Sequence, residues 1–318
     1  MRVEDIDTPR VRSGSEQRIL EDLHWLGFDW DEGPGSSTGA GPAAPYHQSE
    51  RTELYLAALA QLEANGLIYP CDCSRKEIAN VASAPHLGEE GPLYPGTCRP
   101  DAGPAGTAGL PGRPDAGPAG SHRPESGDVP VRPPASCLQP PASRSFRRPP
   151  ATRLALPDHT VVSFVDRVHG AQKVDLARQV GDFVLRRGDG VISYQLAVTV
   201  DDITQGVTEV VRGADLLSST ARQIFLCRSL GAEAPTYAHA PVVVGPDGER
   251  LAKRARGVPI RDQREAGVDP RVIVAYLARA LGLAGPEEVC LWPGELVARF
   301  SWDRIPRGPI MLDPCLFW

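Results

Sequence analysis

The sequence predicts an α/β fold, because apolar segments with helical spacing alternate with short β-branched segments along most of the chain. Its 318 residues are enough for about two domains, and 41% hydrophobic with 23% charged residues is a globular composition. The net charge of −6 argues against a partner bound through overall basic charge, although a local basic patch stays compatible with it. No apolar segment approaches the roughly 20 residues of a membrane-spanning helix. The charged start has no apolar signal region, so we expect a cytoplasmic protein without membrane contact.

The first hundred residues predict a strand end, two helices and a short strand. Residues 3–7 have the pattern of a strand end, and residues 15–26 and 50–65 have amphipathic helical patterns that stop at Gly27 and Gly66. Residues 67–69 predict a strand that leads into a pair of cysteines. The leucine and isoleucine residues expected on the buried helix faces are Ile19, Leu20, Leu23 and Leu26, then Leu54, Leu56, Leu59 and Leu62.

Residues 100–150 have a different composition. They hold 13 of the 32 prolines, and the hexapeptide DAGPAG occurs at 101–106 and again at 115–120. Such a segment has too little apolar surface to offset its ordering entropy, so we predict a disordered insertion, with a semi-rigid Pro-rich spacer as the alternative. The basic residues at 144–153 suit RNA phosphates, but a solvated linker is the simpler interpretation.

The second half predicts further alternation of strands and helices. We expect strands at 160–166, 182–187, 191–202, 207–213 and 239–245, and helices at 216–230 and 270–282, with a small helical tail. Gly188 to Gly190 would join the second and third of these strands. Asp201 and Asp202 would then end a strand and face the site, and no role is assigned to them.

Three segments resemble the catalytic domain of class I glutamyl-tRNA synthetases. They are RVEDID at 2–7, VTVDD at 198–202 and GVTEVVRGADLLSSTARQIFL at 206–226. The chain has no room for the large C-terminal anticodon-binding domain of those enzymes, and it has a cysteine pair followed by Tyr-x-x-x-Cys. In both respects it is similar to their short paralogues, the glutamyl-queuosine tRNA(Asp) synthetases. The resemblance covers residues 1–99 and about 155–318.

The resemblance implies an N-terminally truncated Rossmann-like catalytic domain with a zinc-binding insertion and a small helical C-terminal part. It implies a partial catalytic domain at 1–70, a zinc-binding segment at 71–99 and the Pro-rich insertion at 100–154. The remainder of the catalytic domain would occupy 155–260, and the helical segment 261–318. The implied reaction is activation of L-glutamate by ATP with Mg²⁺, followed by transfer to the queuosine base. The partner would be the tRNA(Asp) anticodon stem-loop, and the enzyme is expected to be a monomer.

The same resemblance assigns three residues to the glutamate substrate. Glu4 would contact its amino group, and Tyr194 and Arg212 match the other substrate positions. An arginine suits a carboxylate because its planar fork can bind both oxygens. Taken singly, Glu4 would be a surface acid and Tyr194 a half-buried aromatic residue on a strand. Arg212 would be a salt-bridge partner of Glu209 or Asp215.

The segment RLAKR at 250–254 occupies the place of the family's second signature, KMSKS. Lys253 matches its second lysine, expected near the ATP phosphates, and Arg250 stands for the first lysine. Ala252 replaces the serine, so a positive charge is kept and a hydroxyl is lost. A plain basic turn is the alternative interpretation.

Four residues match the zinc site of the short paralogues: Cys71, Cys73, Tyr94 and Cys98. Three thiolates and a phenolate oxygen give the four ligands of a tetrahedral structural site for one ion. From the chemistry alone, the three cysteines with His86 form an equal candidate set, and buried free thiols are the third possibility.

The family's first signature, the HIGH motif, does not occur in this sequence and would lie upstream of RVEDID. We therefore predict that the polypeptide as written cannot activate glutamate, because the ATP phosphates lose a helix N-terminus. Two alternative functions stay open. One is a glutamyl-tRNA synthetase fragment that charges the tRNA 3′ end, and the other is a catalytically inactive RNA-binding remnant.

Overall fold

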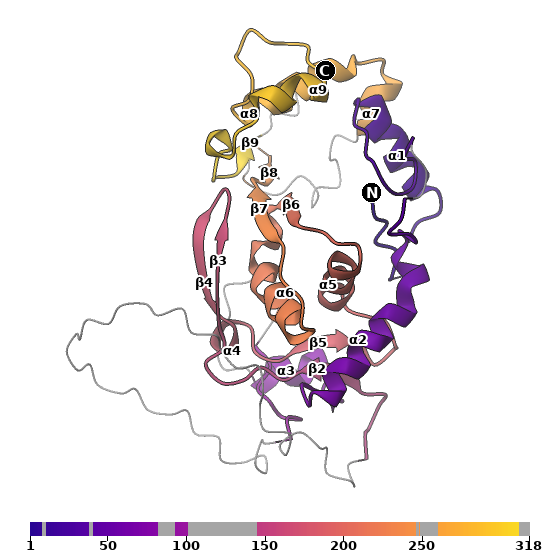
Figure 1. The fold of residues 1–318 in the computed structure, drawn as a ribbon, viewed down its shortest axis with the longest axis vertical. Helices are drawn as coiled ribbons and strands as arrows, with labels where there is room; N and C mark the ends of the chain where they lie inside the picture. The colour runs from indigo at the N-terminus through magenta and orange to yellow at the C-terminus, as the bar shows by residue number, and fades with distance from the viewer. Residues whose placement is uncertain are drawn as a thin grey trace, which may run out of the picture.

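The computed structural model describes residues 1–7, 11–37, 41–81, 93–100, 145–245, 248 and 260–311 (Figure 1). Helices and strands alternate through these ranges, as the sequence predicts. The helices are α1 (Ser15–Trp25), α2 (Thr52–Ala64), α3 (Arg75–Val81), α4 (Leu176–Gln179), α5 (Tyr194–Thr204), α6 (Leu217–Ser229), α7 (Ile260–Glu265), α8 (Pro270–Ala280) and α9 (Pro293–Leu296). The strands are β1 (Ile68–Cys71), β2 (Ala151–Leu154), β3 (Val161–Asp166), β4 (Gly170–Asp175), β5 (Phe183–Arg186), β6 (Glu209–Gly213), β7 (Thr236–Ala240), β8 (Val243–Val244) and β9 (Ile310–Met311).

A four-stranded sheet of order β4-β3-β7-β6 positions the candidate site (Figure 1). Strands β6 and β7 are parallel, β3 and β7 are parallel, and β3 and β4 form an antiparallel hairpin. Arg212 on β6 lies opposite His239 on β7 in this register. Because the carboxyl ends of parallel strands meet at one edge, both residues lie at the edge where α/β proteins bind ligands. A separate antiparallel sheet of order β1-β2-β5 lies at the end of the molecule that carries α3 and α4.

The prediction of a strand at 191–202 was wrong, because residues 194–204 form helix α5. Every residue from 196 to 202 is buried, so the segment shows no alternation of polar and apolar residues that would separate a helix from a strand. Ser193 caps the helix by accepting the N–H of Leu196. A single bridge between Arg186 and Ile192 is what remains of the expected strand pair.

Several predicted boundaries also differ. Residue 3 forms only an isolated bridge to His47, and the strand expected at 239–245 is divided after Ala240 into β7 and β8. Strand β2 occupies residues that the sequence analysis placed at the end of the Pro-rich insertion. Residues 101–144 of that insertion lie outside the described ranges.

The two N-terminal helices are confirmed, and both end where glycine was expected. Gly27 and Gly66 have φ angles of 83° and 68°, the left-handed conformation that ends a helix. The buried face of α2 differs from the prediction. Its buried residues are Tyr55, Ala58, Leu59 and Leu62. Leu54 is exposed, and the prediction was also wrong for Ile19 on α1, which is 54% exposed.

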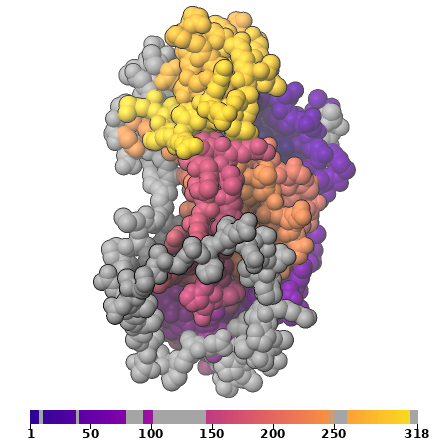
Figure 2. All heavy atoms as spheres, turned by 60° about the vertical axis from the view of Figure 1, so that its left-hand side comes forward, coloured from indigo at the N-terminus to yellow at the C-terminus, as the bar shows by residue number. Residues whose placement is uncertain are grey.

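Two main apolar clusters hold the fold together. The larger lies between α2, α5, α6 and the four-stranded sheet, and it contains Tyr55, Leu62, Leu196, Leu226 and Tyr237. The second joins α8 to the end of α1, so that the C-terminal segment packs against the N-terminal one (Figure 2). Within the described ranges, every helix falls short of the length and apolar character needed to cross a membrane.

Candidate active site

The N-terminal segment lies beside α5 and carries Glu4. Its backbone is fixed by the N–H of Val3, which donates to Tyr46 O at 2.8 Å. Arg2 Nη1 donates to Asp202 Oδ1 at 2.7 Å, and Arg2 Nη2 reaches Glu4 Oε1 at 3.4 Å. The Glu4 side chain stays 42% exposed. The segment is therefore anchored at Arg2 and leaves the Glu4 carboxylate accessible to a cationic ligand.

Tyr194 is the first residue of α5, and it lies between the other two predicted substrate residues. Burial raises the pKa of Tyr194, and the negative charge of Glu4 raises it further. The positive charge of Arg212, which lies near the Tyr194 hydroxyl, opposes this shift of the pKa. The structure thus brings Glu4, Tyr194 and Arg212 together from three separate segments.

Arg212 lies near the carboxyl end of β6, and its guanidinium group has several partners. Nη2 donates to Thr220 Oγ1 at 2.9 Å and to the carbonyl oxygen of Leu216 at 3.3 Å. Nε donates to His239 Nε2 at 3.0 Å. The sequence analysis did not identify Thr220 or His239. The available signals were His239, a polar residue in the predicted buried strand HAPVVVG, and Thr220, a polar residue in the first turns of the predicted helix at 216–230.

Residues 214–216, which follow Arg212 closely in the sequence, line part of a cavity of about 680 Å³. This volume is within the range of small-molecule sites in proteins. Its lining residues are Ala214, Asp215, Leu216, Ser218, Ser219, Pro241, Val242, Val244, Gly248, Arg307 and Pro309. Lys253 and Arg250, predicted near the ATP phosphates, lie outside the described residues. Gly248, which lines this cavity, precedes them in the sequence by only a few residues.

The predicted metal ligands also lie together. The sulfur atoms of Cys71, Cys73 and Cys98 all lie within 4.8 Å of one another. The Tyr94 hydroxyl oxygen is 3.4 Å from Cys71 Sγ and 3.9 Å from Cys73 Sγ. The alternative ligand His86 lies outside the described residues. Three sulfur atoms and one phenol oxygen thus surround a single point, as a four-coordinate zinc ion requires.

The protonation of this cluster reflects its crowding. Burial, together with the neighbouring sulfur atoms of Cys98 and Cys71, raises the pKa of Cys73 to about 12. Burial also acts to raise the pKa of Cys98, but hydrogen bonds from Tyr94 and the backbone of Asp72 lower it overall. Thiolates packed this closely repel one another unless a cation neutralises them, so the donor set fits zinc.

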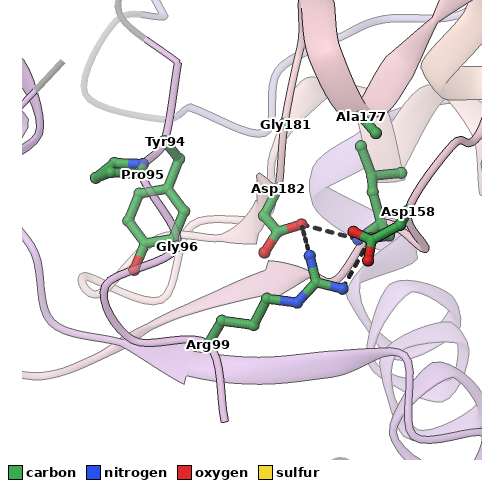
Figure 3. Close-up of a pocket in the computed structure, with 9 residues that line it drawn as sticks. Tyr94, Pro95, Gly96, Arg99, Asp158, Ala177, Gly181 and Asp182 are labelled. Carbon is green, nitrogen blue, oxygen red and sulfur yellow. Dashed lines mark hydrogen bonds and ion pairs between the residues drawn. The ribbon is translucent and has the colours of Figure 1, made fainter. Parts of the chain in front are cut away.

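A second cavity, of about 380 Å³, lies beside the cysteine cluster and involves Asp182 (Figure 3). Arg99 Nη1 donates to Asp182 Oδ1 at 3.4 Å, and the side chains of these two residues point toward one another. Asp182 also accepts the backbone N–H of Leu156 at 2.8 Å and the Tyr69 hydroxyl at 2.6 Å. This buried carboxylate joins the loop that carries Tyr94 and Cys98 to the sheet of β1, β2 and β5.

Comparisons with known proteins agree with this geometry. Residues 1–95 and 139–305 match the family model for the catalytic domain of class I tRNA synthetases (E and Q). A protein of Symbiobacterium thermophilum named glutamyl-Q tRNA(Asp) synthetase is 44% identical over 314 residues, which cover 98% of this chain and 84% of that protein. A protein of Nitratidesulfovibrio vulgaris with the same name is 42% identical over 98% of this chain and 84% of its own length. A glutamate–tRNA ligase of Halorhodospira halophila is 35% identical over 99% of this chain, which spans 58% of the ligase.

The fold has solved counterparts. The crystal structure of a glutamate-tRNA synthetase from Elizabethkingia anophelis superimposes with a TM-score of 0.68 at 20% identity. The match covers 99% of this chain and 61% of the other chain. At this identity the likeness establishes the fold, an α/β catalytic domain of the kind that the sequence predicts.

Proposed function

Because the chain belongs to the family of class I tRNA synthetases for glutamate and glutamine, a family of ligases, we propose that it glutamylates the queuosine base of tRNA(Asp). The observation that carries the proposal is the convergence of Glu4, Tyr194 and Arg212 beside a nucleotide-sized cavity. Relatives with the glutamyl-Q tRNA(Asp) synthetase name support the choice of acceptor, since the chain aligns with most of their length.

The three substrate residues suit L-glutamate. Glu4 supplies an exposed anion for the ammonium group, and Arg212 supplies a fixed cation for a carboxylate. We assign Arg212 to the side-chain carboxylate of the substrate, because that group keeps its charge throughout the reaction. A glutamine amide in the same place has no net charge and carries an NH₂ group that can only donate, as the guanidinium group does, so the site favours glutamate.

The reaction has two steps. An oxygen of the glutamate α-carboxylate attacks the α-phosphorus of ATP, pyrophosphate leaves, and glutamyl-adenylate forms. A hydroxyl of the queuosine base then attacks the carbonyl carbon, AMP leaves, and an ester forms. We place ATP with its Mg²⁺ in the cavity that Leu216, Ser218 and Val242 line, with Lys253 and Arg250 at its phosphates. Since both tRNA and ATP are cytoplasmic substrates, we expect the enzyme to act in the cytoplasm.

We also propose that Cys71, Cys73, Tyr94 and Cys98 hold one zinc ion. Bound zinc would serve as a structural cross-link between the end of β1 and the loop that follows α3. Cys71 ends β1 of the three-stranded sheet, whereas Arg212 lies on β6 of the four-stranded sheet and Tyr194 on α5, so we assign the metal no step of the reaction.

The test uses radiolabelled L-glutamate, ATP, Mg²⁺ and two purified proteins, the polypeptide as written and the same polypeptide extended upstream to the next in-frame start codon. Three acceptors are compared: tRNA(Asp) with queuosine, the same tRNA with guanosine at that position, and tRNA(Glu). From the extended protein we expect label only on the first acceptor, in the nuclease fragment that contains the anticodon, and from the polypeptide without the HIGH motif we expect no label. Label on the 3′ end of tRNA(Glu) would establish the glutamyl-tRNA synthetase alternative and overturn the proposal. Label on none of the acceptors from either protein would identify a non-catalytic protein.

Variants link the activity to the site. Arg212→Lys keeps a positive charge and loses the planar fork, so the KM for glutamate should rise about tenfold or more. Arg228→Lys is the matched control, because Arg228 is exposed on α6, the helix that follows β6 in the chain. Unchanged kinetics in Arg212→Lys would remove Arg212 from the glutamate site.

A further inference from the structure

A buried row of polar groups runs from β3 through β7 to Arg212. Asp166, the last residue of β3, is 1% exposed and His239 on β7 is fully buried. The Nδ1 of His239 lies 2.6 Å from Asp166 Oδ2, and its Nε2 lies 3.0 Å from Arg212 Nε. The hydroxyl of Thr220, also fully buried, lies 3.2 Å from the same Nε2.

The chemistry of these groups fixes the tautomer of His239. An arginine Nε–H can only donate, so His239 Nε2 must accept and carries no proton. The proton is therefore on Nδ1, which donates to Asp166. Burial lowers the pKa of His239, which keeps the ring neutral, and Asp166 stays an anion that also accepts the N–H groups of Val168 and His169.

A histidine paired with an aspartate often acts as a general base, but this pair is not free to do so. The lone pair that a base would use, on Nε2, already accepts from Arg212 and lies beside the Thr220 hydroxyl. The ring is fully buried, and its other nitrogen is occupied by Asp166. The function of the pair is therefore directed at Arg212 rather than at a reacting atom.

The bonds to Arg212 fix which part of its guanidinium group can reach a ligand. Nε donates to His239, and Nη2 donates to Thr220 and to the carbonyl oxygen of Leu216. None of these bonds uses Nη1. A free arginine side chain loses rotamer entropy when a ligand fixes it, and anchoring it in advance removes that cost from binding.

We infer that His239, oriented by Asp166, is a positioning residue that holds Arg212 for the substrate carboxylate. This inference rests on the proposed function, since Arg212 is assigned there to glutamate. The Asp166 carboxylate fixes the imidazole, and the imidazole acceptor fixes Arg212. Thr220 and Leu216 complete the set of acceptors around the guanidinium group.

Two substitutions at residue 239 separate the two bonds of the ring. His239→Asn places an amide N–H near Nδ1, so it keeps the bond to Asp166 and loses the acceptor for Arg212. His239→Gln places an amide oxygen near Nε2, so it keeps the acceptor for Arg212. We expect His239→Asn to raise the Kd for L-glutamate about tenfold to a hundredfold, as loss of a charge-assisted hydrogen bond predicts. His239→Gln should restore most of the lost affinity.

The measurement is isothermal titration of L-glutamate and, separately, of ATP into each variant. The Kd for ATP should stay within about twofold in both, because neither bond involves the nucleotide cavity. His24→Asn, a change at an exposed histidine, is the control for loss of an imidazole. Equal glutamate affinity in wild type and His239→Asn would overturn the inference while leaving the proposed function intact. Wild-type protein that binds no glutamate would overturn both.

A second measurement covers the case in which the variants do not fold. In wild-type protein with ¹⁵N-labelled histidine, we expect one of the seven histidines to be a neutral Nδ1–H tautomer whose Nε2 signal moves in Arg212→Lys. A protonated Nε2, or a signal that ignores Arg212→Lys, would contradict the inference whether or not glutamate binds.

Discussion

Replacing Asp201 by alanine should destabilise the protein strongly, because one fully buried carboxylate accepts hydrogen bonds from three side chains and also forms an ion pair with Arg2 at 3.8 Å. Arg51 Nε donates to Asp201 Oδ1 at 2.6 Å, the Gln48 amide donates to Oδ2 at 2.8 Å, and the Tyr55 hydroxyl donates from 3.0 Å. The carboxylate is completely buried and Arg51 is 3% exposed. These contacts join the 3-10 turn at 48–51 and helix α2 to helix α5.

The magnitude follows from what the substitution leaves behind. Removing one partner of a buried ion pair costs about 3–5 kcal/mol, because the other charge remains buried without compensation. A stranded hydroxyl and a stranded amide each add roughly 1 kcal/mol or more. The three effects share one site and do not add fully. We therefore expect Asp201→Ala to lower the free energy of unfolding by about 4–6 kcal/mol, a large part of a typical total of about 5–15 kcal/mol.

The assay is urea unfolding followed by far-ultraviolet circular dichroism and by tryptophan fluorescence, with agreement of the two probes required. Asp189→Ala is the matched control, because Asp189 forms an exposed ion pair with Arg187, worth about 0–1 kcal/mol. If the stranded charge is the cause, adding Arg51→Met to Asp201→Ala should recover part of the lost stability. A loss below about 1 kcal/mol in Asp201→Ala, or no recovery in the double variant, would refute the reasoning.

Three further predictions concern other parts of the molecule. Cys98→Ser should abolish stoichiometric zinc binding and lower the midpoint of thermal unfolding, whereas Cys290→Ser, a change at an exposed cysteine, should leave the zinc content and the midpoint unchanged. Elemental analysis measures the zinc content, and calorimetry measures the midpoint. Hydrogen bonds from the backbone and hydroxyl of Ser74 lower the pKa of Glu77 to about 2 from its ordinary 4.5. Its stabilisation of α3 is therefore complete above about pH 4.5 and lost toward pH 2, and Glu77→Gln should remove this pH dependence from amide exchange in α3. Gly27→Ala should lower stability in urea unfolding by about 1 kcal/mol or more, since φ is +83° and a Cβ would lie 2.6 Å from the Trp292 ring; an unchanged midpoint would contradict this.

Local signals account for the parts of the fold that sequence analysis predicted. Helices α1 and α2 were predictable because apolar residues recur at helical spacing and a glycine follows each helix. Helix α5 was not, because its buried, β-branched sequence shows no polar face. Two signals were available: Ser193 before the segment is a good N-cap, and Gly206 after it has a φ of 67°, as is common where a helix ends.

The candidate site divides in the same way. Glu4, Tyr194 and Arg212 were found through short motifs, yet only the fold shows that they adjoin. The bond between Asp166 and His239 joins residues 73 positions apart, and no local pattern predicts which polar groups two parallel strands bring together. Sequence motifs thus identified the groups that we propose to contact the substrate, and the groups behind them required the sheet register.

The pairing of β1 with β2 has a consequence for how this protein tolerates change. Cys71 lies opposite Ala151, so about 80 residues of chain connect two adjacent strands. The entropy of closing a flexible loop grows only with the logarithm of its length, about 0.6 kcal/mol for each doubling. A change in the length of this connection that keeps α3 and the cysteine cluster would therefore alter the closure entropy by less than one good core contact provides. Selection on stability acts weakly on the length of this connection, which leaves mutation free to lengthen or shorten it between related proteins.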